Sequence, residues 1–198
     1  MDLLFLGSLL AFVTASTITP GPNSIMIMAS GVNFGFARTI PHVLGVAVGI
    51  TTVITLAGIG LGAILGLVPQ LRFAMLVASA TYLLYLAWKI ANAAPAGGSM
   101  SVGTPFTFIQ ALGFQWVNPK VWALGMAAVA IYAPQNTTSS ILLVALSFAL
   151  VGLVSNTAWA WFGTVIRRFL STGRRLRVFN VIAALSLVAS LLPAFLLN

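Results

Sequence analysis

The sequence predicts an all-α polytopic membrane protein with six transmembrane helices, arranged as two inverted three-helix repeats. Three observations lead to this prediction: the chain is apolar and nearly free of charge, its apolar runs are long enough to cross a membrane, and each half holds three of them. Hydrophobic residues make up 60% of the 198 residues and charged residues only 5%, against about 25% charged residues in an ordinary soluble domain. The chain is therefore expected to be embedded in lipid.

Six apolar runs follow one another along the chain. Each comes close to or exceeds the length of about 20 residues that a helix needs to cross the hydrocarbon layer. The first run lacks the positively charged segment that precedes a cleaved signal peptide, which favours a retained span. Short polar or glycine- and proline-rich stretches separate the runs. The runs cover residues 3–31, 39–68, 71–91, 106–132, 141–166 and 179–197.

The midpoint of the chain falls in the stretch APAGGSMSVGTP, which is rich in proline, glycine and serine. We expect a single membrane domain over 1–198, with a first three-helix repeat at 1–92, a cytoplasmic linker at 93–105 and a second repeat at 106–198. Three spans in each half place the halves upside down relative to each other. This is the inverted-repeat arrangement of many secondary transporters.

Basic residues are distributed unevenly between the two sets of loops. The loops after the first, third and fifth runs hold seven Lys and Arg, whereas the loops on the opposite side hold only Arg72. Cytoplasmic loops carry the excess of positive charge, so both termini are expected on the outer, periplasmic side of the membrane. The net charge of +8 is then loop charge and not a nucleic-acid surface. The arginine-rich stretch at 167–177 anchors this topology, with docking of anionic lipid or of a partner as the alternative.

The first and fourth runs are interrupted by prolines, in 19-TPGPN-23 and in 115-QWVNPK-120. Pro20 and Pro22 lack an N–H and should break the helix, and Gly21 loosens the backbone between them. Non-helical backbone at membrane depth is tolerated only where protein or a wet cavity covers it. A kink of purely structural use would explain one such site. Two sites in corresponding positions of the two halves predict a central polar pathway.

Lys120 lies deep in the fourth run, 14 residues after Phe106 and 12 before Tyr132. A lysine near a helix centre costs about 2.5 to 3.5 kcal/mol on insertion scales, and such residues usually face a cavity or a partner. Snorkelling to the interface is the alternative, but both ends of the run are distant. The candidate substrate-binding or pathway residues are Pro20, Gly21, Pro22, Asn23, Gln115, Asn118, Pro119, Lys120 and Asn156. For Asn156, and for the further candidate His42, an interhelical hydrogen bond is the preferred alternative.

Two longer stretches, TPGPNSIMIMASGVNFGFARTIPHVLGVAVG and GFQWVNPKVWALGMAAV, resemble the LysE/RhtB family of bacterial amino-acid exporters. PGP in the first span paired with NPK in the fourth is a specific combination, and the resemblance covers essentially the whole chain. It implies a secondary transporter in the bacterial cytoplasmic (inner) membrane that exports amino acids or close derivatives. It also implies an ion gradient as the driving force, with protons as the expected ion. The positions that match the family pattern are Pro20, Gly21, Pro22, Asn118, Pro119 and Lys120.

The inventory of reactive side chains argues against an enzyme. The chain has one histidine, His42, one aspartate, Asp2, and neither cysteine nor glutamate. These residues form no metal-ligand set or acid–base pair, so no catalytic residue, metal ion or cofactor is expected. Proton-coupled carriers commonly use intramembrane carboxylates. Proton coupling here would have to rely on Lys120, on His42, on Asp2 or on a group of the substrate.

The sequence is also compatible with two other functions: a translocator of another small solute or ion on the same fold, and a non-transporting membrane subunit. The expected partners are a small-molecule amino-acid substrate and membrane lipid, with no nucleic acid. A homo-oligomer is compatible with the sequence but not predicted by it.

Overall fold

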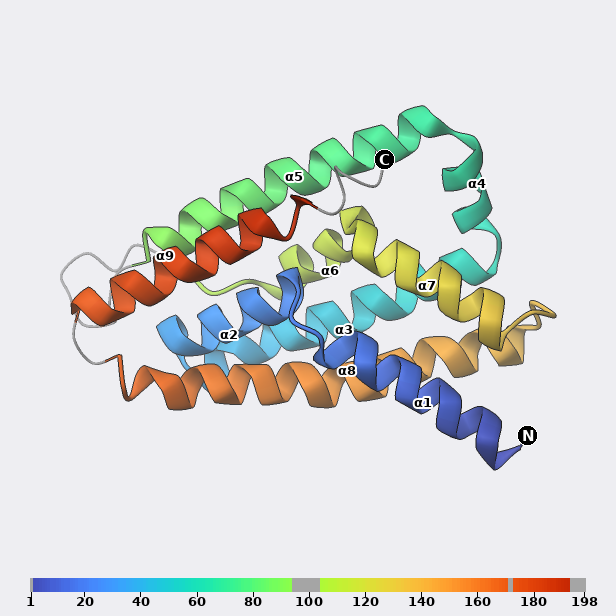
Figure 1. Cartoon of the computed structure of the whole chain (residues 1–198), viewed down its shortest axis with the longest axis horizontal. Coiled ribbons are helices and arrows are strands. Elements are labelled where there is room, and N and C mark those ends of the chain that lie inside the picture. Colours follow the sequence, from blue (N-terminus) through green and yellow to red (C-terminus); the bar gives the residue numbers. More distant parts are fainter. Residues whose placement is uncertain (1, 94–103, 171–172, 193–198) are drawn as a thin grey trace.

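The structure, a computed structural model, describes residues 2–93, 104–170 and 173–192, and all regular structure in these ranges is helical (Figure 1). Most of the linker predicted at 93–105 and the end of the sixth run lie outside the described residues. The helices are α1 (Leu3–Ile18), α2 (Pro22–Phe34), α3 (Phe36–Gly58), α4 (Leu61–Leu67), α5 (Pro69–Ala91), α6 (Phe108–Val117), α7 (Pro119–Tyr132), α8 (Thr138–Arg167) and α9 (Gly173–Ala189).

The first apolar run forms two helices, α1 and α2, whose axes differ in direction by 56°. Gly21 is the extended N-cap of α2, and Pro22 occupies its first turn, where the missing N–H costs no hydrogen bond. The fourth run is divided in the same way between α6 and α7. Asn118 separates these two helices, and its Oδ1 accepts a hydrogen bond from the main-chain N–H of Lys120 at 3.1 Å. Both runs therefore contain a helix C-terminus and a helix N-terminus within a few residues.

The second apolar run differs from the prediction of one segment over 39–68. It forms the long helix α3 and the short helix α4, joined at Ile59 and Gly60. Gly60 has a φ of +102°, a left-handed conformation that glycine adopts without a Cβ penalty. The run is thus not one continuous helix, because a glycine in an apolar segment fits a turn as well as a helix.

Within the described residues, α3, α5 and α8 are each long and apolar enough to cross a membrane, and the bent pair α1 and α2 is a fourth candidate. Helix α7 is apolar but has only 14 residues. Large apolar side chains on the outer face of α8 lie uncovered by protein, including Leu150, Val154 and Trp161, which are 61–72% exposed. In lipid such exposure has no hydrophobic cost. The protein is a multi-pass membrane protein.

Helices α3 and α8 connect the two interrupted helix pairs, and in Figure 1 α8 (orange) runs along the lower edge of the molecule. They pack against each other, and each also packs against both helices of an interrupted pair: α8 against α1 and α2, and α3 against α6 and α7. Helices α5 and α9 lie side by side along one flank. Each half of the chain thus supplies a helix that supports the interrupted pair of the other half.

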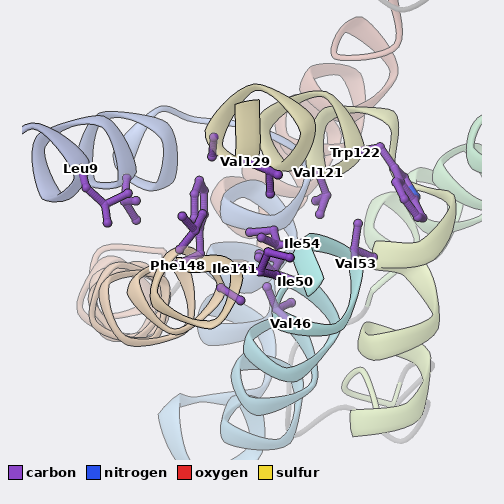
Figure 2. Packing of buried hydrophobic residues seen from close by; sticks show 14 of the residues in the cluster. Leu9, Val46, Ile50, Val53, Ile54, Val121, Trp122, Val129, Ile141 and Phe148 are labelled. Carbon is purple, nitrogen blue, oxygen red and sulfur yellow. The ribbon is translucent and has the colours of Figure 1, made fainter. Parts of the chain in front are cut away.

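Close approach of α2 to α8 depends on glycine. Gly163 of α8 faces the main chain of Met28, and Gly31 of α2 faces the main chain of Ala160, so closely that a Cβ at either glycine would overlap a carbonyl oxygen. Between α3, α7 and α8 the interior is filled by aliphatic side chains together with Phe148 and Trp122 (Figure 2). This packing holds the interrupted helices in fixed positions at the centre of the molecule.

Candidate functional site

A cavity of about 50 Å³ lies where the two interrupted helix pairs meet. A single water needs roughly 10–15 Å³ on such a measure, so the cavity has room for several non-hydrogen atoms. Its walls come from α1, α2, α3, α7 and α8. The lining residues are Ser16, Thr17, Thr19, Gly21, Pro22, Asn23, Ser24, Ile50, Ile54, Asn118, Lys120, Val121, Leu124, Phe148 and Asn156.

Lys120 reaches from the first turn of α7 to the segment between α1 and α2. A Cβ added at Gly21 would lie 2.8 Å from Lys120 Nζ, so the ammonium group rests directly on the main chain of that segment. The side chain of Lys120 is half-buried. Asp2 carries the only acidic side chain of the protein, and it precedes α1 at the end far from the cavity. Among the residues that the structure describes, no side-chain carboxylate lies near Lys120.

Helix geometry adds to the positive character of the cavity. Helix α2 begins at Pro22 and α7 begins at Pro119, and residues from the first turn of both helices line the cavity. Helix N-termini carry partial positive charge and unpaired N–H groups. Together with the ammonium group of Lys120, they make this end of the cavity suited to an anionic group.

A pair of side-chain amides joins the two interrupted runs beside the cavity. Asn23 Nδ2 donates to Gln115 Oε1 at 2.8 Å, and Gln115 Nε2 donates to Asn23 Oδ1 at 3.1 Å. Gln115 Nε2 also donates to the carbonyl oxygen of Ala111 at 2.8 Å. Gln115 is fully buried, and it contacts Asn23 without lining the cavity. Its position fixes the start of α2 against the end of α6.

The structure therefore brings together Gly21, Pro22, Asn23, Asn118, Lys120 and Asn156 around one cavity, with Gln115 behind Asn23. Pro20 and Pro119 flank the site without lining it. Their effect is on the main chain, because each sits where a helix ends or begins.

His42 lies away from this site. Its ring packs on Phe106 with centroids 4.8 Å apart, and neither ring nitrogen has a hydrogen-bond partner among the described residues. Ile50 of the same helix lines the cavity, and the eight intervening residue steps correspond to about 12 Å along the helix axis. His42 and Lys120 are thus not members of one cluster.

Two groups of polar residues are absent from the sequence prediction. Ser16, Thr17 and Thr19, in or just after the last turn of α1, line the cavity with Ser24; their position flanking the prolines was the signal that could have identified them. The second group is a buried amide pair between α2 and α9, in which Asn33 Nδ2 donates to Asn180 Oδ1 at 2.9 Å and Asn180 Nδ2 donates to Asn33 Oδ1 at 3.1 Å. No local sequence pattern predicts this amide pair.

Comparison with known proteins places this chain in a transporter family. The model of the LysE type translocators matches residues 14–192. The chain is 31% identical over 192 residues to the cysteine/O-acetylserine efflux protein of Salmonella typhimurium, covering 95% of this chain and 96% of that protein. It is 30% identical over 174 residues to the protein of the same name from Klebsiella pneumoniae, covering 86% and 88%. No solved structure matches the chain significantly. The chain belongs to the LysE type translocator family.

Proposed function

We propose that this protein is a secondary transporter that exports small amino acids or close derivatives across the cytoplasmic membrane. Membership of the LysE type translocators and similarity to proteins named for cysteine and O-acetylserine efflux support export of compounds of that size. The observation that carries the proposal is the contact between Lys120 Nζ and Gly21. This contact joins the two interrupted runs at one cavity that is partly lined by polar side chains.

The proposed binding mode pairs Lys120 with the carboxylate of the substrate. An ammonium group at membrane depth needs a counter-charge, carbonyl groups or water to offset its desolvation. The described residues supply no side-chain carboxylate near it, whereas an amino acid brings a carboxylate. The N-terminus of α2 adds main-chain N–H groups for the same carboxylate, and lysine serves it as a compact point charge. In α7 the N–H groups of Lys120 and Val121 are already bonded to Asn118, so this helix contributes only the partial positive charge of its N-terminus.

The proposed architecture is six spans in two inverted repeats that work by alternating access. In support, α8 packs on α1 and α2 as α3 packs on α6 and α7. Aromatic contacts hold α1 against α7 and α8 on one side: Phe5 and Tyr132 have ring centroids 5.7 Å apart, Phe12 and Phe148 are 6.4 Å apart, and Tyr132 OH donates to the Ser8 carbonyl at 3.1 Å. Opening on this side would require α1 to separate from α7 and α8.

The experiment that tests the function is transport into everted membrane vesicles, in which export is measured as uptake. We expect labelled O-acetylserine or cysteine to accumulate only when the protein is present, and accumulation to collapse when a protonophore removes the proton gradient. Uptake that persists without the gradient would contradict proton coupling, for which Lys120 and His42 are the proposed titrating groups. Uptake of a different solute would favour the alternative translocator, and absence of any uptake would favour a non-transporting subunit.

The topology gives a separate prediction. Because of the charge bias between loops, both termini are expected outside and the arginine-rich stretch at 167–177 inside. The natural chain has no cysteine, so any labelling of a single-cysteine variant occurs at the introduced residue. In spheroplasts, Gln135→Cys should react with a membrane-impermeant maleimide and Gly173→Cys should react only after lysis; both positions are exposed. Labelling of Gly173→Cys in intact spheroplasts would contradict the orientation.

A further inference from the structure

The last turn of α1 presents hydroxyl groups that can only accept hydrogen bonds. Ser16 Oγ, Thr17 Oγ1 and Thr19 Oγ1 each donate to the main-chain carbonyl four residues earlier, at 2.6–2.9 Å. A hydroxyl group has one proton and two lone pairs. All three protons are committed to α1 itself, and all three residues line the cavity. These hydroxyl groups can therefore bind a ligand only through their lone pairs.

The main chain adds acceptors at the same place. Pro20 and Pro22 have no N–H, so the carbonyl groups of Ser16 and Ile18 lack the donor that a continuing helix would supply. The Thr17 carbonyl between them accepts a hydrogen bond from Ser155 Oγ at 3.0 Å. The C-terminus of a helix also carries partial negative charge. This end of α1 is therefore suited to a cation.

Asn156 of α8 provides a second, independent indication of a ligand. Its side chain is only 6% exposed and lines the cavity. No hydrogen bond joins its amide to another residue that the structure describes, and the amide atoms are not fully enclosed by protein, so they are reachable from the cavity. A buried amide normally has a partner, because leaving it unpaired costs free energy. A bound ligand would supply the missing partner.

The cavity is thus polarised. Positive charge comes from Lys120 and from the N-termini of α2 and α7, and main-chain donors come from α2, whereas acceptors come from the end of α1 and from Asn156 Oδ1. We propose that the cavity binds the α-amino acid in one orientation, with the carboxylate at Lys120 and the ammonium group at the last turn of α1 and Asn156. Asn156 is then a specificity-determining residue that selects a free amino group. This inference rests on the proposed function.

Comparing two isomeric ligands tests the contribution of the free amino group alone. O-acetylserine and N-acetylserine contain the same atoms and the same carboxylate, but only O-acetylserine has an ammonium group. Serinamide keeps the ammonium group and lacks the carboxylate. Binding to the purified protein in detergent would be measured by isothermal titration at mildly acidic pH, where migration of the acetyl group from oxygen to nitrogen is slow.

We expect the wild-type protein to bind O-acetylserine at least about tenfold more tightly than N-acetylserine, as for loss of a hydrogen-bonded charged group. Asn156→Leu should weaken binding of O-acetylserine by about tenfold and leave N-acetylserine unchanged, so that the preference collapses. Ser147→Ala is the matched control, because Ser147 is a buried residue of α8 that bonds to its own helix and lies outside the cavity. It should keep the wild-type preference.

Equal affinity of the wild-type protein for both isomers would overturn the proposed orientation, as would an Asn156→Leu variant that weakens both isomers alike. If Asn156→Leu does not fold, Thr19→Val removes one acceptor from the same wall at an exposed position and should lower the preference about threefold; an unchanged preference would overturn the proposal. If serinamide binds as tightly as O-acetylserine, the proposed pairing of the carboxylate with Lys120 is wrong. That result would not contradict the proposed site for the ammonium group. Failure of both isomers to bind would refute the proposed function, and this inference with it.

Discussion

Replacing Lys120 with methionine is expected to abolish export while leaving insertion into the membrane intact. The substitution removes a charge that costs about 2.5 to 3.5 kcal/mol to insert, and methionine keeps the length and flexibility of the side chain. It also removes the group that we propose to pair with the substrate carboxylate. Truncating one member of a buried charge pair costs about 2 to 5 kcal/mol, or roughly 30- to 4,000-fold in binding. Uptake into everted vesicles, normalised to the amount of protein in the membrane, measures the effect.

Lys89→Met is the matched control. Lys89 lies in the last turn of α5, where its Nζ donates to Thr104 Oγ1 at 3.3 Å, and it does not line the cavity. This variant should export normally. Lys120→Arg should retain part of the activity, because the guanidinium group keeps the charge but is larger and differently shaped. Export by Lys120→Met at the wild-type rate would show that Lys120 has only a structural or topological role.

Replacing Pro20, Gly21 and Pro22 together with alanine is expected to join α1 and α2 into one helix and to stop export. Each proline costs about 3 kcal/mol and glycine about 1 kcal/mol relative to alanine in a helix interior, so the variant gains helical stability. The 56° change of direction between α1 and α2 would then be lost, and with it the helix N-terminus at the cavity. In addition, the new Cβ at position 21 would displace Lys120 Nζ, which lies 2.8 Å from that point.

We expect export by this triple variant to fall at least about a hundredfold, the loss that follows when binding groups move by about 1 Å. Circular dichroism of the purified protein should show equal or greater helix content. Pro69→Ala provides the control, because Pro69 is a helix-starting proline at the first turn of α5 and lies away from the cavity. Retained export by the triple variant would mean that the interruption is incidental to transport.

The class of the protein and the places where its helices stop follow from neighbouring residues. Apolar composition predicts a membrane protein because lipid excludes unpaired backbone and charge. A proline removes an N–H wherever it stands, so the ends of α1 and α6 lie next to Pro20 and Pro119 for a purely local reason. Gly60 shows the limit of such reasoning: the same residue type fits a helix or a left-handed turn, and the run at 39–68 divides there.

Which polar residues share the cavity was decided by tertiary structure. Gly21 meets Lys120, and Asn23 pairs with Gln115, through the packing of α2, α6 and α7 around α3 and α8, which no short-range pattern encodes. The sequence presented His42 and Asn156 alike, as lone polar groups in apolar runs. In the folded protein, His42 packs against Phe106, whereas Asn156 lines the cavity. The sequence by itself determined the membrane class and the main-chain interruptions, because these depend on local chemistry. The site was decided only by the fold, because it depends on contacts between residues about a hundred positions apart.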